Sequence, residues 1–142
     1  MDATEDLEEL LDESVRHALG ADTGHGWSAA TAVPLRFEEL EPGTLGWRMG
    51  LTPPGGAAGD ATIVLLLLPS ILTPGTPRGI PLRGVKRSDF VHIGYLAGPP
   101  RLLLLAQATD AATRRALAPL ATTVLDRLRD ETTPGGPAGA PR

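Results

Sequence analysis

The sequence predicts an α+β fold in which an antiparallel sheet of about five strands carries helices from both ends of the chain. Apolar residues recur at helical spacing over residues 3–19 and again after about Thr109. Between these ends, short apolar or alternating runs are separated by turns rich in Gly and Pro. Consecutive strands between terminal helices favour a single sheet with both helices packed on one face.

Each terminal helix is expected from its apolar stripe. The N-terminal stripe consists of Leu7, Leu10, Leu11, Val15, Ala18 and Leu19, and the C-terminal stripe of Leu117, Leu120, Ala121, Val124, Leu125 and Leu128. Gly20 supplies a stop after the first helix. Pro119 interrupts the second, where a proline removes a hydrogen bond and costs about 3 kcal/mol. We therefore expect a kink at Pro119, or a break with the longer piece starting there.

Five stretches between the helices have the character of strands. They are TAVPLRF (31–37), TLGWRMGLT (44–52), ATIVLLLLP (61–69), DFVHIGYLA (89–97) and RLLLLAQA (101–108). Pro34 places the first stretch at an edge of the sheet, because proline has no backbone N–H to donate to a neighbouring strand. In the second, Trp47 and Met49 share a face and Arg48 points the other way. The continuous apolar runs in 61–69 and 101–108 are typical of central strands covered on both faces.

Composition narrows the class of protein. The chain of 142 residues has no cysteine, which excludes disulfides, thiolate nucleophiles and Cys-based metal sites. Its longest apolar run, at 63–68, is far shorter than the roughly 20 residues of a spanning helix. The acidic N-terminus lacks a signal-peptide pattern. We expect one domain over 1–131, a disordered Pro/Gly tail over 132–142, and a cytoplasmic protein that binds no membrane.

Residue usage and charge add two further expectations. Arginine is abundant and Lys86 is the only lysine, while Ala, Gly and Pro are frequent, which indicates a GC-rich bacterial genome. The net charge of −4 disfavours nucleic acid as a partner.

Motifs for catalysis are weak. Asp22, Thr23 and Gly24 resemble the catalytic tripeptide of aspartic proteases, and His25 follows them. Asp and Gly are also ordinary turn formers, and none of the three histidines has metal-ligand spacing to another. We expect a noncatalytic protein without catalytic, cofactor-binding or metal-binding residues. The alternative is a small hydrolase or ligand-binding domain with a site around Asp22 and His25.

The most informative stretch for function is the arm at residues 69–90. Prolines 74, 77 and 81 keep this long connection extended, and four of the 13 basic residues fall between Arg78 and Arg87. The residues expected to bind a partner are Arg78, Ile80, Leu82, Arg83, Val85, Lys86 and Arg87. Apolar anchors between cations favour a protein partner with an acidic, partly apolar surface. Two alternatives are that the arm folds back on the acidic first helix, or that it is a solvated loop.

The order of elements also resembles the secretion-chaperone fold and its bacterial relatives. The stretches LEELLDESVRHALG (7–20) and FVHIGYLAGPPRLLLLAQATDAATRRALAPLATTVLDRL (90–128) carry the resemblance, with the order helix, three strands, insertion, two strands, helix. The proline-rich arm stands where those proteins have a middle helix. The resemblance implies a noncatalytic, chaperone-like adaptor that binds another protein.

Overall fold

The computed structural model describes residues 3–41, 43–54, 61–68, 82–96 and 101–132. Its elements in chain order are α1 (Ala3–Leu19), η1 (Asp22–Gly24), β1 (Ser28–Ala29), β2 (Val33–Pro34), η2 (Phe37–Glu39), β3 (Leu45–Thr52), β4 (Ala61–Leu67), η4 (Arg87–Asp89), β5 (His92–Leu96), β6 (Leu102–Ala108) and α2 (Ala111–Thr132).

The strands form one antiparallel sheet, which confirms the predicted α+β fold class. The order across the six-stranded sheet is β1-β3-β4-β6-β5, and β2 also pairs with β3. The two continuous apolar runs become β4 and β6, which lie side by side in the middle of the sheet. The sequence indicated a single edge strand around Pro34 and missed β1, whose two residues leave too short a pattern to detect.

The edge formed by β1 and β2 contains a β-bulge. Ala29 lies opposite Leu51 and Val33 opposite Arg48, so three edge residues face two residues of β3 between these pairs. One extra residue is therefore inserted in the edge strand after Ala30. A bulge locally bends the strand and disrupts its ladder.

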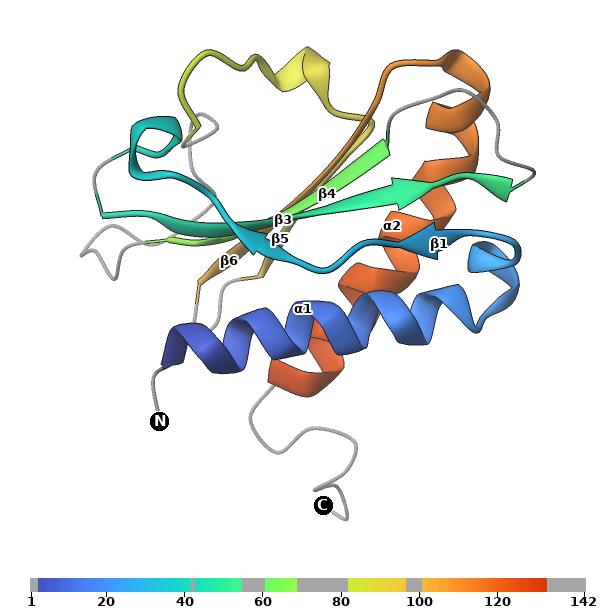
Figure 1. Ribbon diagram of the computed structural model, residues 1–142, viewed down its shortest axis with the longest axis horizontal. Helices are drawn as coiled ribbons and strands as arrows, with labels where there is room; N and C mark the ends of the chain where they lie inside the picture. The colour runs from blue at the N-terminus through green and yellow to red at the C-terminus, as the bar shows by residue number, and fades with distance from the viewer. Residues whose placement is uncertain (1–2, 42, 55–60, 69–81, 97–100, 133–142) are drawn as a thin grey trace.

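Both helices cover one face of the sheet, as predicted, and Figure 1 shows them together on that side. The core there joins the helix stripes to Trp47, Met49, Ile63 and Leu65 of β3 and β4 and to alternate residues of β6. Leu120, on α2, has no exposed surface. This face of the sheet, called the helix face below, carries most of the apolar burial.

The opposite face, called the second face, is also covered, which explains why β4 and β6 are apolar without alternation. Val64, Leu66, Leu103 and Leu105 point to it and are buried with Leu40, Leu68 and Phe90. The cover includes residues 82–90, called the basic segment, which crosses above the sheet in Figure 1. The alternative in which the arm folds back on the first helix is therefore wrong for residues 82–90, since α1 lies on the other face. The prolines 74, 77 and 81 lie outside the described residues.

The C-terminal helix is continuous. Residues 111–132 form a single helix with Pro119 inside it, so the alternative of a break at Pro119 is wrong. The Pro119 side chain is exposed, and the Thr123 hydroxyl donates to the Pro119 carbonyl at 3.1 Å. Thr132 belongs to the helix, and the remainder of the expected tail lies outside the described residues. No helix in the described ranges has the length and hydropathy needed to cross a membrane.

Candidate protein-binding site

The basic segment is fastened to the chain that follows η2. Leu82 forms an isolated antiparallel bridge with Leu40. The Arg83 backbone N–H donates to the Glu39 carbonyl at 3.0 Å, and the Arg83 Nε donates to the Leu40 carbonyl at 3.3 Å. These bonds hold the start of the segment at a fixed place over the second face.

A groove of about 220 Å³ opens between the basic segment and the sheet. Its lining residues are Leu35, Glu39, Arg48, Thr62, Val64, Leu82, Arg83, Val85, Phe90 and Gln107. The lining thus combines five aliphatic or aromatic side chains with three charged side chains, of which two are arginines. We call this cavity the second-face groove. It offers an apolar anchor position next to positive charge.

Glu39 is the one acidic side chain in that lining, and it lies between arginines. Its Oε1 is 3.4 Å from the Arg36 Nε, and its Oε2 is 3.4 Å from the Arg48 Nη1. A hydrogen bond from the Arg36 backbone N–H lowers the pKa of Glu39, and the charge of Arg48 lowers it further against the opposing effect of burial. Glu39 is therefore an intramolecular carboxylate that already pairs with Arg48, one of the two arginines that line the groove.

Lys86 and Arg87 extend the positive surface toward β5. The Asp89 carboxylate accepts a hydrogen bond of 2.8 Å from the Lys86 backbone N–H, which caps the short helix η4. The side chains of Lys86 and Arg87 are exposed. Within the described part of the chain, neither joins an ion pair. Their charges are therefore available to an acidic partner.

The structure divides the predicted binding residues into two groups. Arg83, Lys86 and Arg87 are exposed, whereas Leu82 and Val85 are half-buried and pack against the second-face core. The two apolar residues therefore anchor the segment to its own sheet and offer a partner only their remaining surface. Arg78 and Ile80 lie outside the described residues.

Sequence reasoning missed the residues that complete the groove. Glu39 comes from η2, Arg48 from β3 and Gln107 from β6, so the groove is assembled from distant parts of the chain. The sequence did indicate the orientation of Arg48, because alternation along β3 places its side chain on the face of the sheet opposite to that of Trp47. Nothing in the sequence indicated that the basic segment would lie over that face.

The alternative site around Asp22 and His25 is an exposed turn. Both side chains are exposed, and the His25 backbone N–H donates to the Asp22 carbonyl at 3.3 Å. Gly24 is buried, and a Cβ there would overlap the Ala18 carbonyl at the end of α1. The turn therefore needs glycine at position 24 for a close backbone approach, which gives Gly24 a packing role.

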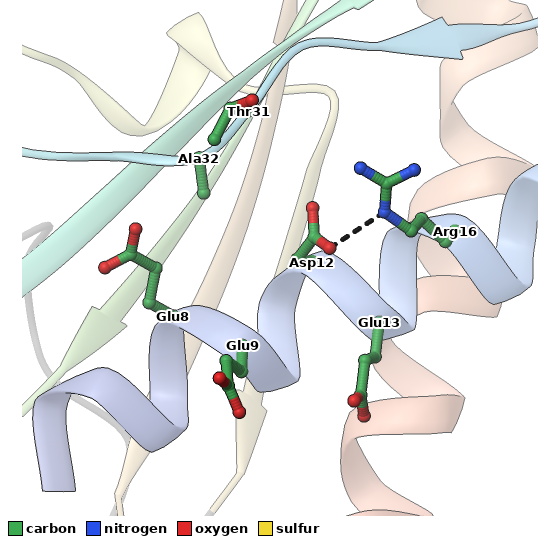
Figure 2. A pocket seen from close by; sticks show the side chains of 7 residues that line it. All are labelled: Glu8, Glu9, Asp12, Glu13, Arg16, Thr31 and Ala32. Atoms are coloured by element: carbon green, nitrogen blue, oxygen red, sulfur yellow. Dashed lines mark hydrogen bonds and ion pairs between the residues drawn. The ribbon is translucent and has the colours of Figure 1, made fainter.

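A second groove, of about 580 Å³, lies between α1 and the bulged edge of the sheet. Figure 2 shows Glu8 and Asp12 rising from α1 toward Thr31 and Ala32, while Glu9 and Glu13 point away. The Asp12 carboxylate accepts a hydrogen bond of 2.8 Å from the Arg16 Nε and thereby raises the pKa of Arg16.

This acidic groove is a largely exposed helix face beside an edge that resists strand pairing. The extra residue after Ala30 disrupts the edge, and Pro34 has no N–H to offer. Across the described ranges, His, Asp and Glu side chains form no cluster of three or more that could hold a metal ion.

Comparison with known proteins gives no relative. No protein-family model matches the chain, and neither a curated protein nor a solved structure matches it.

Proposed function

We propose that the protein is a noncatalytic adaptor, or chaperone-like accessory protein, that binds an acidic, partly apolar segment of another protein at the second face of its sheet. The observation that supports this proposal most directly is the second-face groove, where apolar walls meet Arg48 and Arg83. Lys86 and Arg87 add exposed positive charge on the same segment.

The size of the groove favours a protein partner over a small molecule. Its volume of about 220 Å³ is below the roughly 300–1,000 Å³ typical of small-molecule sites. A single apolar side chain of a partner suits such a space, with its flanking carboxylates placed near the arginines. Charges at the rim of an interface steer association and fix orientation more than they add affinity. The exposed cations of the basic segment suit that role.

The fastening of the basic segment supports recognition without large rearrangement. Its bridge to Leu40 and the two hydrogen bonds of Arg83 hold the start of the segment and the Arg83 side chain in place before a partner arrives. A surface that is already ordered loses less conformational entropy on docking.

Selection of peptides from a random library on the immobilised protein tests this proposal. We expect the selected sequences to combine acidic residues with one or two large apolar residues, and their binding to weaken with salt. The control selection uses Arg48→Glu with Arg83→Glu, which should reverse the preference for acidic residues. Selected sequences without acidic enrichment on the wild-type protein would overturn the proposal.

A further inference from the structure

The two edges of the sheet differ in how well they resist an added strand. The β1–β2 edge is interrupted by its bulge and by Pro34. At the other edge, β5 keeps an unbroken register with β6 from His92 to Leu96 and contains neither proline nor a charged residue other than the titratable His92. Within the part of the chain that the structure describes, β5 pairs with β6 alone. An edge strand of this kind presents backbone N–H and C=O groups that can pair with another chain.

A groove of about 480 Å³ lies next to the residue that precedes this strand. It lies between Val91, which precedes β5, and the first half of α2, and its other lining residues are Ala111, Arg114, Arg115 and Ala118. The Arg114 Nη1 donates to the Ala108 carbonyl at 3.2 Å, while Arg115 is exposed. We call this cavity the edge groove. Its lining is apolar apart from two cations and includes no acid.

We propose that a further extended stretch of the acidic partner, beyond the segment at the second-face groove, binds as an additional strand on the outer edge of β5, with an acidic side chain at Arg115 and an apolar side chain in the edge groove. This inference rests on the proposed function for the chemistry of the partner. The basic segment ends two residues before β5 begins, so its cations precede the strand in the chain. Arg114 and Arg115 of α2 supply further positive charge in the edge groove. Strand addition obtains affinity from main-chain hydrogen bonds and specificity from alternate side chains.

Charge distinguishes this occupant from a second copy of the protein. Antiparallel pairing of β5 with its own copy would bring His92, Ile93, Gly94, Tyr95 and Leu96 to the edge, and none of these residues is acidic. Such pairing leaves Arg115 without a counter-charge from the added strand. An extended segment that carries Asp or Glu complements it. Burial lowers the pKa of His92, and the negative charge of Asp126, further along α2, partly offsets this effect. Because like charges repel, partner carboxylates are expected near Arg115 and away from Asp126.

The test uses a soluble peptide of Glu-Val-Val-Glu repeats, which presents both residue types on each face of a strand. Two N-methylated versions are prepared, each modified at alternate residues so that one of its two hydrogen-bonding edges is blocked. We expect one version to lose about tenfold or more in affinity, because two or more main-chain bonds of about 0.5–1.5 kcal/mol are removed. The other version should bind as the parent does. A Lys-Val-Val-Lys peptide should not bind.

Variants of the protein locate the added strand. Arg115→Gln should weaken binding of the Glu-containing peptide and reduce its salt dependence, whereas Arg16→Gln in the acidic groove should leave binding unchanged. Hydrogen exchange provides a direct readout, with slower exchange expected in residues 91–96 when the peptide is bound.

The possible outcomes separate this inference from the proposed function. Equal binding of both N-methylated versions, or no binding of the parent peptide, overturns strand addition, while acidic enrichment in the library selection would still support the proposed function. Self-association that protects residues 91–96 without peptide would make a second copy the occupant and would also overturn it. A third outcome is that the library selection shows no acidic enrichment while the Glu-Val-Val-Glu peptide still binds and one N-methylated version loses affinity. That outcome would instead overturn the role of the basic segment.

Discussion

The two faces of the sheet are both covered, but by different means. On the helix face, α1 and α2 close a core whose central side chains, such as Leu117 and Leu120, have no exposed surface. On the second face, a short irregular segment is held by half-buried anchors and keeps a groove open beneath it. Burial on the helix face therefore maintains the fold, whereas the second face combines cover with an accessible, charged surface.

The largest difference between the faces is expected from removal of buried side chains. Leu120→Ala should lower the free energy of unfolding by about 2–5 kcal/mol, because it leaves a cavity in a closely packed core. Leu82→Ala on the second face should cost less than half as much, since Leu82 is only partly buried. Equilibrium unfolding in urea measures both values. Equal losses would mean that the basic segment is as much a part of the core as α2.

Two glycines provide a matched test of packing. A Cβ added at Gly94 would overlap the Leu125 side chain on the helix face, whereas a Cβ at Gly50 would meet no heavy atom within 4 Å. Gly94→Ala should therefore destabilise the protein by about 1–3 kcal/mol. Gly50→Ala should change its stability little. Thermal unfolding monitored by circular dichroism compares them, and equal effects would contradict the close approach of α2 to β5.

A third difference concerns pH. Burial lowers the pKa of His92 below 6.5, partly offset by the charge of Asp126, and the His92 Nε2 is buried without a hydrogen-bond partner in the described structure. Because the unfolded chain then binds a proton more readily than the folded protein, the contribution of His92 to stability falls as pH drops below about 6.5. Above about pH 6.5 the contribution of His92 to stability is constant.

Urea unfolding at a series of pH values between 8 and 5 measures this effect. The range spans the pKa of about 6.5 that an unperturbed histidine has. His92→Gln should flatten the dependence, whereas the matched variant His25→Gln, at an exposed position, should retain it. A wild-type slope that persists in His92→Gln would assign the pH dependence to other groups.

The smallest expected effect on stability is at Glu39. Glu39→Gln removes the partner of two exposed arginine pairs, which are worth about 0–1 kcal/mol each at most. The same change frees Arg48 and removes the carboxylate that competes with an acidic partner, so the affinity of library-selected acidic peptides should rise. Isothermal titration calorimetry measures the change. Unchanged or lower affinity would mean that Glu39 organises the groove and does not compete for it.

Most of the fold could be predicted from the sequence, because local patterns determine it. The stripes of the two helices, the apolar runs of β4 and β6 and the edge position of Pro34 all follow from spacing within a few residues. The bulge and β1 could not be predicted, because they depend on register with β3, which is a non-local property.

The site could be predicted only in part for the same reason. The cations Arg83, Lys86 and Arg87 of the basic segment were visible in the sequence as a cluster of charges, and all three are exposed in the structure. Leu82 and Val85 were expected to face a partner and instead face the sheet, since a short run of sequence does not show what lies beneath it. Arg48 and Glu39 join the groove only through the fold.

The basic segment on the second face is proposed to recognise an acidic partner. The most direct test of this claim is the affinity of a library-selected acidic peptide for the triple variant Arg83→Glu, Lys86→Glu and Arg87→Glu. The control is Arg16→Glu, Arg127→Glu and Arg129→Glu, which makes the same change in net charge on the helices. We predict that the first triple variant keeps its thermal unfolding temperature and loses its affinity for the peptide, while the control variant retains most of that affinity. Equal affinity of the two variants, with both folded, would contradict the claim.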